Sequence, residues 1–115
     1  MPVVFVIATD WTLRAAVRAE LRELGIDALG IDSPDDAGRA LAGNQMPAAV
    51  VLEATAELAG NSAIQNLVQR VPTILIASRT ETVPLPPAAA VLYRPGRVGD
   101  IVAAVRGLLA RGHAA

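Results

Sequence analysis

The sequence predicts an α/β fold, a doubly wound sheet of five parallel strands with helices on both faces. Short runs of Val, Ile, Leu and Ala are continuous rather than alternating, which is typical of parallel strands covered on both faces. Helical patterns lie between the runs, and such alternation favours a parallel sheet with right-handed crossovers. The 115 residues suit one domain, residues 1–115, whose core is aliphatic because only 3% of the residues are aromatic.

The expected strands are short apolar segments. The clearest are "VVFVIA", "AAVVLE", "TILIAS" and "AAVLY", and "DALGI" is a weaker fifth. In chain order, these strands cover residues 3–8, 27–31, 48–53, 73–78 and 89–93.

The first expected helix covers residues 10–25, where apolar residues recur every three or four positions and form one face. Asp10 or Thr12 can cap its start, and Gly25 can end it. Its three arginines form a second stripe, which we interpret as a solvated face. Trp11 lies at its start, and we favour a role for this side chain in covering a loop over a role in binding.

Three further helices follow. Ser33 is a natural N-cap, the proline after it is a natural first helical residue, and Gly43 closes that helix. Apolar residues within 64–71 mark a third helix. Those within 101–109 mark a last helix, which we expect to end near Gly112.

A gap interrupts this rhythm at residues 78–89, where the alternation would place a fourth helix between the last two strands. Pro84, Pro86 and Pro87 each lack a backbone donor, and a helix cannot run through them. We therefore expect this helix to be reduced or absent, with no long helix over residues 80–88.

Composition excludes several classes of function. The net charge of −1 provides no basic field for nucleic acid or an anionic membrane surface. The ten basic residues are all Arg, which excludes a Schiff-base or P-loop lysine, and there is no Cys. His113 is interpreted as a tail residue. No apolar run reaches membrane-spanning length and the N-terminus lacks the basic n-region of a signal peptide, so we expect a cytoplasmic protein. We also expect it to need no metal or cofactor.

Polar residues follow the expected strands. In open α/β sheets, ligands bind outside the carboxyl ends of the strands. The residues at these ends are Ala8, Thr9, Asp10, Glu53, Ala77, Ser78, Arg94 and Pro95. Glu53 is notable because it ends a buried-looking run. It either marks the mouth of a site or shows that the strand has reached water.

Four segments together resemble the receiver domains of response regulators in two-component signalling. "PAAVVLE" resembles the family's Pro-x-x-(apolar)₃-Asp strand, and "PTILIAS" its Pro-Val-Ile-x-Leu-Thr-Ala strand. "VLYRPG" resembles its Tyr-x-x-Lys-Pro-Phe segment, and "DSPDDAGRAL" its second strand-to-helix passage. The resemblance covers nearly the whole chain and implies a flavodoxin-like sheet with strand order 2-1-3-4-5.

The resemblance also implies where the phosphorylation site of a receiver would lie. The family's Mg²⁺-holding acid pair falls at Ala8 and Thr9, and Asp10 is one residue late. The phosphoacceptor Asp falls at Glu53. Since neighbouring strand residues face opposite sides, we expect Asp10 not to rebuild the site.

The switch positions differ too. The family's Thr or Ser falls at Ala77, with Ser78 one residue late, and its switch aromatic falls at Val91, with Tyr93 two residues on. Its Lys falls at Arg94. Phosphoryl transfer needs Mg²⁺ and a well-placed nucleophile, and Glu is one methylene longer than Asp. These changes favour a pseudo-receiver that signals without phosphorylation and is not an enzyme.

Two alternatives stay open at this point. One is a flavodoxin-like domain that binds a small ligand, or acts as an enzyme, in the crevice at the strand ends. The other is an atypical receiver that is still phosphorylated. The sequence lacks the GxGxxG and GxSxG patterns of common enzyme classes.

Three structural expectations complete the prediction. Glu53 and Arg94 should face each other across the strand ends, and Pro95 should follow a cis peptide bond. The missing helix should also uncover an apolar surface that includes Leu85, Val91 and Tyr93. Uncovered apolar patches tend to mark contacts, so we expect a protein partner or self-association through this surface.

Overall fold

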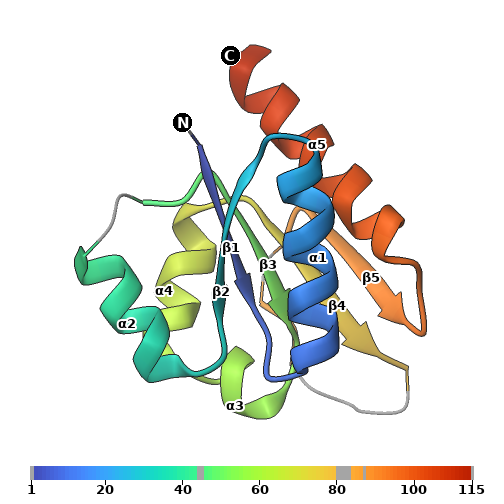
Figure 1. The fold of residues 1–115 in the computed structure, drawn as a ribbon. Helices are drawn as coiled ribbons and strands as arrows, with labels where there is room; N and C mark the ends of the chain where they lie inside the picture. Colours follow the sequence, from blue (N-terminus) through green and yellow to red (C-terminus); the bar gives the residue numbers. More distant parts are fainter. Residues whose placement is uncertain (1, 44–45, 80–83, 87, 115) are drawn as a thin grey trace.

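A computed structural model describes residues 2–43, 46–79, 84–86 and 88–114. Five parallel strands form one sheet in the order β2-β1-β3-β4-β5, which confirms the predicted fold class and strand order (Figure 1). The strands are β1 (Val3–Ile7), β2 (Asp27–Ile31), β3 (Ala49–Glu53), β4 (Thr73–Ser78) and β5 (Ala90–Arg94).

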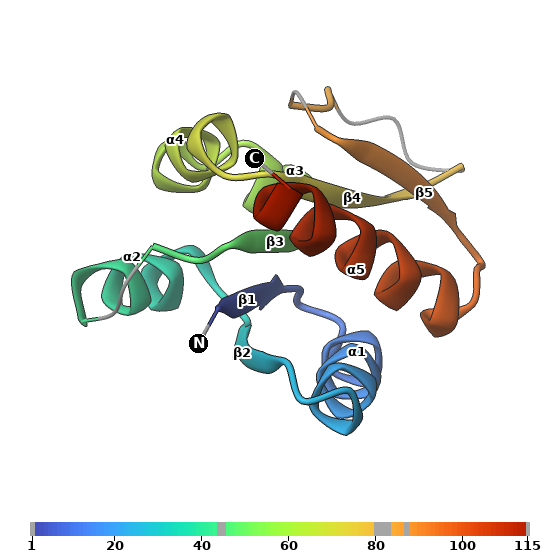
Figure 2. The same cartoon turned by 90° about the horizontal axis from the view of Figure 1, so that it is seen from above.

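Helices cover both faces of the sheet (Figures 1 and 2). They are α1 (Trp11–Glu23), α2 (Pro34–Gly43), α3 (Ala56–Ala59), α4 (Ser62–Arg70) and α5 (Val98–Ala114). Helices α1 and α5 pack on one face, and α2, α3 and α4 on the other. Among the described residues, no helix is both long enough and apolar enough to cross a lipid bilayer.

The central strands supply side chains to two cores because successive residues of a strand point to opposite faces. In β1, Val4 and Val6 enter the core under α1 and α5, whereas Phe5 and Ile7 enter the core under α2 and α4. All five side chains of β3 are buried. Continuous apolar runs are therefore the expected pattern for these strands.

Side-chain caps fix where the helices begin. Asp10, not Thr12, caps α1 and accepts a hydrogen bond from the backbone N–H of Leu13. Ser33 Oγ accepts from the N–H of Asp36, as its N-cap position predicted. After α1, Gly25 adopts φ 76°, a left-handed conformation that favours glycine.

The helices differ from the prediction in two places. The short helix α3 was not predicted; Thr55 caps it by accepting from the N–H of Leu58. Helix α5 continues to Ala114, past its expected end near Gly112. Between β4 and β5, residues 84–86 and 88 are not helical, so no continuous helix covers 80–88, as predicted. Residues 80–83 and 87 lie outside the described residues.

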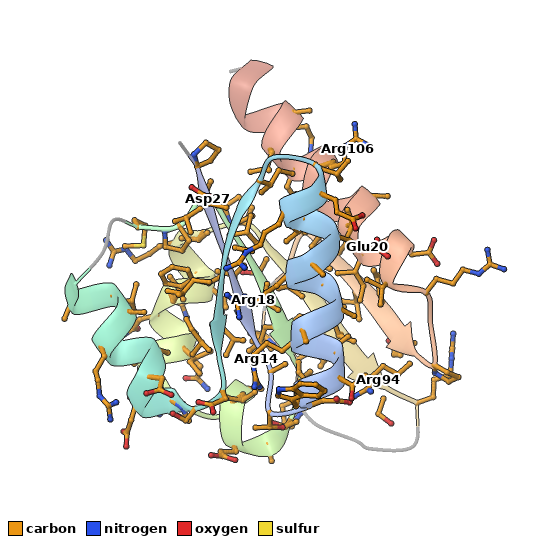
Figure 3. The ribbon with its side chains drawn as sticks, in the orientation of Figure 1. Arg14, Arg18, Glu20, Asp27, Arg94 and Arg106 are labelled. Atoms are coloured by element: carbon orange, nitrogen blue, oxygen red, sulfur yellow. The ribbon has the colours of Figure 1, made fainter. Side chains whose placement is uncertain are left out.

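The prediction of a solvated arginine stripe on α1 was wrong for two of its three members. Arg14 Nη1 donates to the carbonyl oxygen of Ala8 at 2.7 Å, and Arg18 Nε donates to that of Ala28 at 3.4 Å. Figure 3 shows both side chains between α1 and β2. The aliphatic parts of both arginine side chains pack over Gly30. A Cβ added at Gly30 would lie 2.9 Å from Arg18 Cδ, which is closer than van der Waals contact. Backbone carbonyls near the edge strand attract these side chains, and a charge pattern cannot reveal them.

Candidate functional site

Glu53 is the centre of a hydrogen-bond network at the carboxyl ends of the strands. It is the last residue of β3, and only 7% of its surface is exposed. Its Oε1 accepts from the N–H of Thr9 at 2.9 Å, from Thr9 Oγ1 at 2.9 Å, and from the N–H of Asp10 at 3.3 Å. The chain after β1 therefore wraps around one carboxylate oxygen.

Arg94, the last residue of β5, holds the other carboxylate oxygen. Its Nη1 donates to Glu53 Oε2 at 3.1 Å, and its Nη2 donates to Asp10 Oδ2 at 2.5 Å. One planar guanidinium thus bridges two carboxylates from different parts of the chain. The prediction that Glu53 and Arg94 face each other is confirmed. The predicted cis bond between Arg94 and Pro95 is also present.

Asp10 has two roles in this network. Its Oδ1 caps α1, and its Oδ2 pairs with Arg94. The hydrogen bond from Arg94 is the largest cause that lowers the pKa of Asp10 below its usual value of 3.8, and the N–H of Leu13 adds to it. That Asp10 does not rebuild a metal site stays a prediction, but its premise, that the Asp10 side chain turns to the other face of the strand, was wrong. β1 ends at Ile7, so the alternation of strand side chains does not apply at Asp10.

Thr9 has a role that the sequence resemblance does not predict. It occupies the position of an acid in the receiver family, and its backbone N–H and its hydroxyl both donate to Glu53. The available signal was its chemistry: a hydroxyl and an N–H just after a strand can satisfy a carboxylate at the end of a neighbouring strand.

The other predicted site residues lie at or just after the carboxyl ends of the same strands. Ala8 is buried, and its carbonyl accepts from Arg14. Ala77 is buried in β4, while Ser78 ends that strand as the register partner of Arg94. Within the described ranges, no group of three or more His, Cys, Asp or Glu residues could hold a metal ion. No buried side-chain N or O atom in that part of the chain lacks a hydrogen-bond partner.

A pocket of about 620 Å³ adjoins the network. Asp10 and Arg94 form part of its wall, together with the start of α1, the ends of β4 and β5, and the first turn of α5. Ser78, Tyr93 and Pro95 also line it. The pocket therefore lies at the carboxyl edge of the sheet, where open α/β folds bind ligands.

Solved structures with the same architecture come from several bacteria. A response regulator receiver protein from Burkholderia phymatum aligns with a TM-score of 0.77 at 23% identity, over 96% of each chain. A receiver domain protein from Clostridium thermocellum aligns with a TM-score of 0.76 at 16% identity, over 98% of each chain. A Francisella response regulator receiver domain aligns with a TM-score of 0.77 at 18% identity, over 97% of this chain and 99% of the other.

The fold is that of a response-regulator receiver domain. The likeness to the receiver family that four sequence segments indicated is thus confirmed for the fold. No protein-family model matches the sequence, and no curated protein sequence matches it significantly.

The receiver fold of this chain exposes the surface expected beside β5. Val91 and Tyr93 point away from the α5 side of the strand and are 37% and 42% exposed, and Leu85 is 42% exposed. The Arg79 guanidinium lies 4.6 Å from the centre of the Tyr93 ring, a cation–π contact.

Trp11, at the start of α1, is 70% exposed, so the expectation that it covers a loop was wrong.

Proposed function

We propose that the chain is a cytoplasmic interaction domain of the receiver type that signals without phosphorylation and has no catalytic activity of its own. The single observation that carries this proposal is the Arg94 guanidinium, which bridges Glu53 and Asp10. Glu53 stands where a receiver carries its phosphoacceptor Asp, and it is already bound on both oxygens.

The bonding of the carboxylates supports this proposal further. Each carboxylate oxygen of Glu53 and Asp10 accepts at least one hydrogen bond from the protein. Mg²⁺ demands near-octahedral coordination by oxygen ligands. To bind here, the ion would have to displace the guanidinium of Arg94 from both carboxylates. A phosphoryl group would in addition have to enter the space that Arg94 fills.

We therefore expect the chain not to accept a phosphoryl group. After incubation with acetyl phosphate and Mg²⁺, intact-mass spectrometry should show the unmodified mass. Titration with Mg²⁺ should produce no saturable change in Trp11 fluorescence, although Trp11 directly follows Asp10 in the chain. A receiver domain with the usual acid pair and Asp, treated in parallel, shows that the phosphodonor is active. A stoichiometric mass gain would overturn the proposal in favour of an atypical, phosphorylated receiver.

The surface formed by Leu85, Val91 and Tyr93 is our proposed contact face. β5 is an edge strand, and Val91 and Tyr93 lie on its face away from α5, while Leu85 is exposed in the segment that leads to β5. Large apolar side chains gathered on one exposed face tend to mark protein contacts. Tyr93 adds an aromatic ring, and aromatic residues are enriched at protein interfaces.

We expect the chain to self-associate through this contact face. Sedimentation velocity should show an average mass that rises with protein concentration, and Val91→Ser should reduce that rise because it places a hydroxyl in the apolar face. Leu24→Ser is the matched control, since Leu24 is 47% exposed just after α1, away from the contact face. A wild-type chain that stays monomeric at high concentration would contradict self-association.

A further inference from the structure

The pocket beside the network has an apolar floor. Ile76 and Ile101 are buried in the core under α1 and α5, and Leu13 and Leu92 pack against that core. Ala16 completes this side of the pocket, and its small side chain leaves room between α1 and β5. At about 620 Å³, the pocket falls within the range of about 300–1,000 Å³ that is typical of sites for small organic ligands.

The rim of the pocket is charged. Arg94 pairs there with Asp10, and because it also pairs with Glu53, its single positive charge is already shared between two carboxylates. Asp100 lies in the first turn of α5, where the helix dipole stabilises a negative charge. Arg97 is exposed, and its guanidinium forms no hydrogen bond or ion pair with any residue that the structure describes. Arg97 is therefore the cation of the rim that is available to a ligand.

We propose that this pocket binds a small, mainly apolar molecule that carries one anionic group. The apolar body lies over Ala16 and Leu92, and the anionic group pairs with Arg97. Sites of this kind combine an apolar lining with a few polar groups that fix orientation. The proposal rests on the pocket alone and goes beyond the proposed function. Because Arg94 and Asp10 line the pocket, a bound ligand also contacts two residues of the Glu53 network. Ligand binding can therefore affect this network without a phosphoryl group.

Titration with anilinonaphthalene sulfonate tests the apolar part of this site, since the dye combines aromatic rings with one sulfonate and fluoresces when shielded from water. We expect saturable binding of one dye per chain. Ala16→Leu should fill the pocket and weaken binding by about tenfold or more, equivalent to roughly 1.4 kcal/mol. Ala19→Leu is the control, because Ala19 is exposed on the same helix and does not line the pocket.

A second pair of variants tests the anionic part. Arg97→Ala should weaken sulfonate-dye binding by about fivefold. It should leave binding of the uncharged dye N-phenylnaphthylamine nearly unchanged. Arg106→Ala is the matched control, since Figure 3 shows Arg106 projecting from α5 far from Arg94. Equal loss of both dyes in Arg97→Ala would overturn the assigned role of Arg97.

Three results would overturn the pocket assignment. They are no saturable binding to the wild type, undiminished binding to Ala16→Leu, and loss of binding in Val91→Ser, which would place the dye on the contact face. Circular dichroism must show that each variant is folded, because partly unfolded chains also bind such dyes. If Ala16→Leu does not fold, Ala16→Val provides the same test with less added volume. Phosphorylation of the chain would refute the proposed function without affecting this result.

Discussion

Replacement of Glu53 by Ala is expected to lower the free energy of unfolding by about 2–3 kcal/mol. The substitution removes an acceptor that receives four hydrogen bonds, and it leaves the N–H groups of Thr9 and Asp10 without this partner. The loss stays moderate because the Thr9 hydroxyl is near the surface and can turn to water. Chemical denaturation followed by circular dichroism measures the change.

Glu57→Ala is the matched control for this prediction. Glu57 is a second glutamate only four residues further on, is exposed in α3, and forms no ion pair with any described residue. Its replacement should change stability by no more than about 0.5 kcal/mol. Equal effects of the two substitutions would mean that Glu53 is a strand end in water and contributes nothing special to the fold.

Replacement of Arg94 by Met is expected to cost about 1–2 kcal/mol at neutral pH. It leaves the nearly buried Glu53 carboxylate without its cation and removes the second partner of Asp10. The expected cost is smaller than for Glu53→Ala because the Arg94 side chain is 40% exposed and water screens its charge. Arg39→Met is the control, since the Arg39–Asp36 pair is exposed and screened by water, so its loss should change stability much less than the loss of Arg94.

The effect of Arg94→Met should also depend on pH. In the folded protein, the pKa of Asp10 lies below its usual value of 3.8, chiefly because of Arg94. Such a group stabilises the fold fully above its unfolded pKa, and the contribution is lost as the pH falls through the folded pKa. The difference between the wild type and Arg94→Met should therefore be constant well above pH 3.8 and shrink as the pH falls below that value. A difference that grows toward low pH would contradict this assignment.

The sheet and the Glu53–Arg94 pair could be predicted because each depends on a strong, regular signal. Continuous apolar runs indicate strands buried on both faces, and the proline-rich segment excludes a helix. Once parallel strands are assumed, their carboxyl ends must meet at one edge, which brings Glu53 toward Arg94.

Other features could not be predicted because they depend on irregular backbone. Asp10 and Thr9 reach Glu53 from a loop, where no periodic rule gives the direction of a side chain. Helix α3 has only four residues, too few to display a helical period. Arg14 and Arg18 bind backbone carbonyls, and a sequence does not display such acceptors.

The position of Arg94 has a consequence for local opening of the sheet. β5 is an edge strand that pairs with β4 alone, and its side chains alternate between half-buried and exposed. Such strands tend to fray, and their amide protons exchange with solvent through local openings. Here the terminal residue of the strand is bound to Glu53 of β3 and to the cap of α1, so its release requires two ion pairs to break. The strand should therefore open from its Ala90 end, with the slowest amide exchange nearest Arg94.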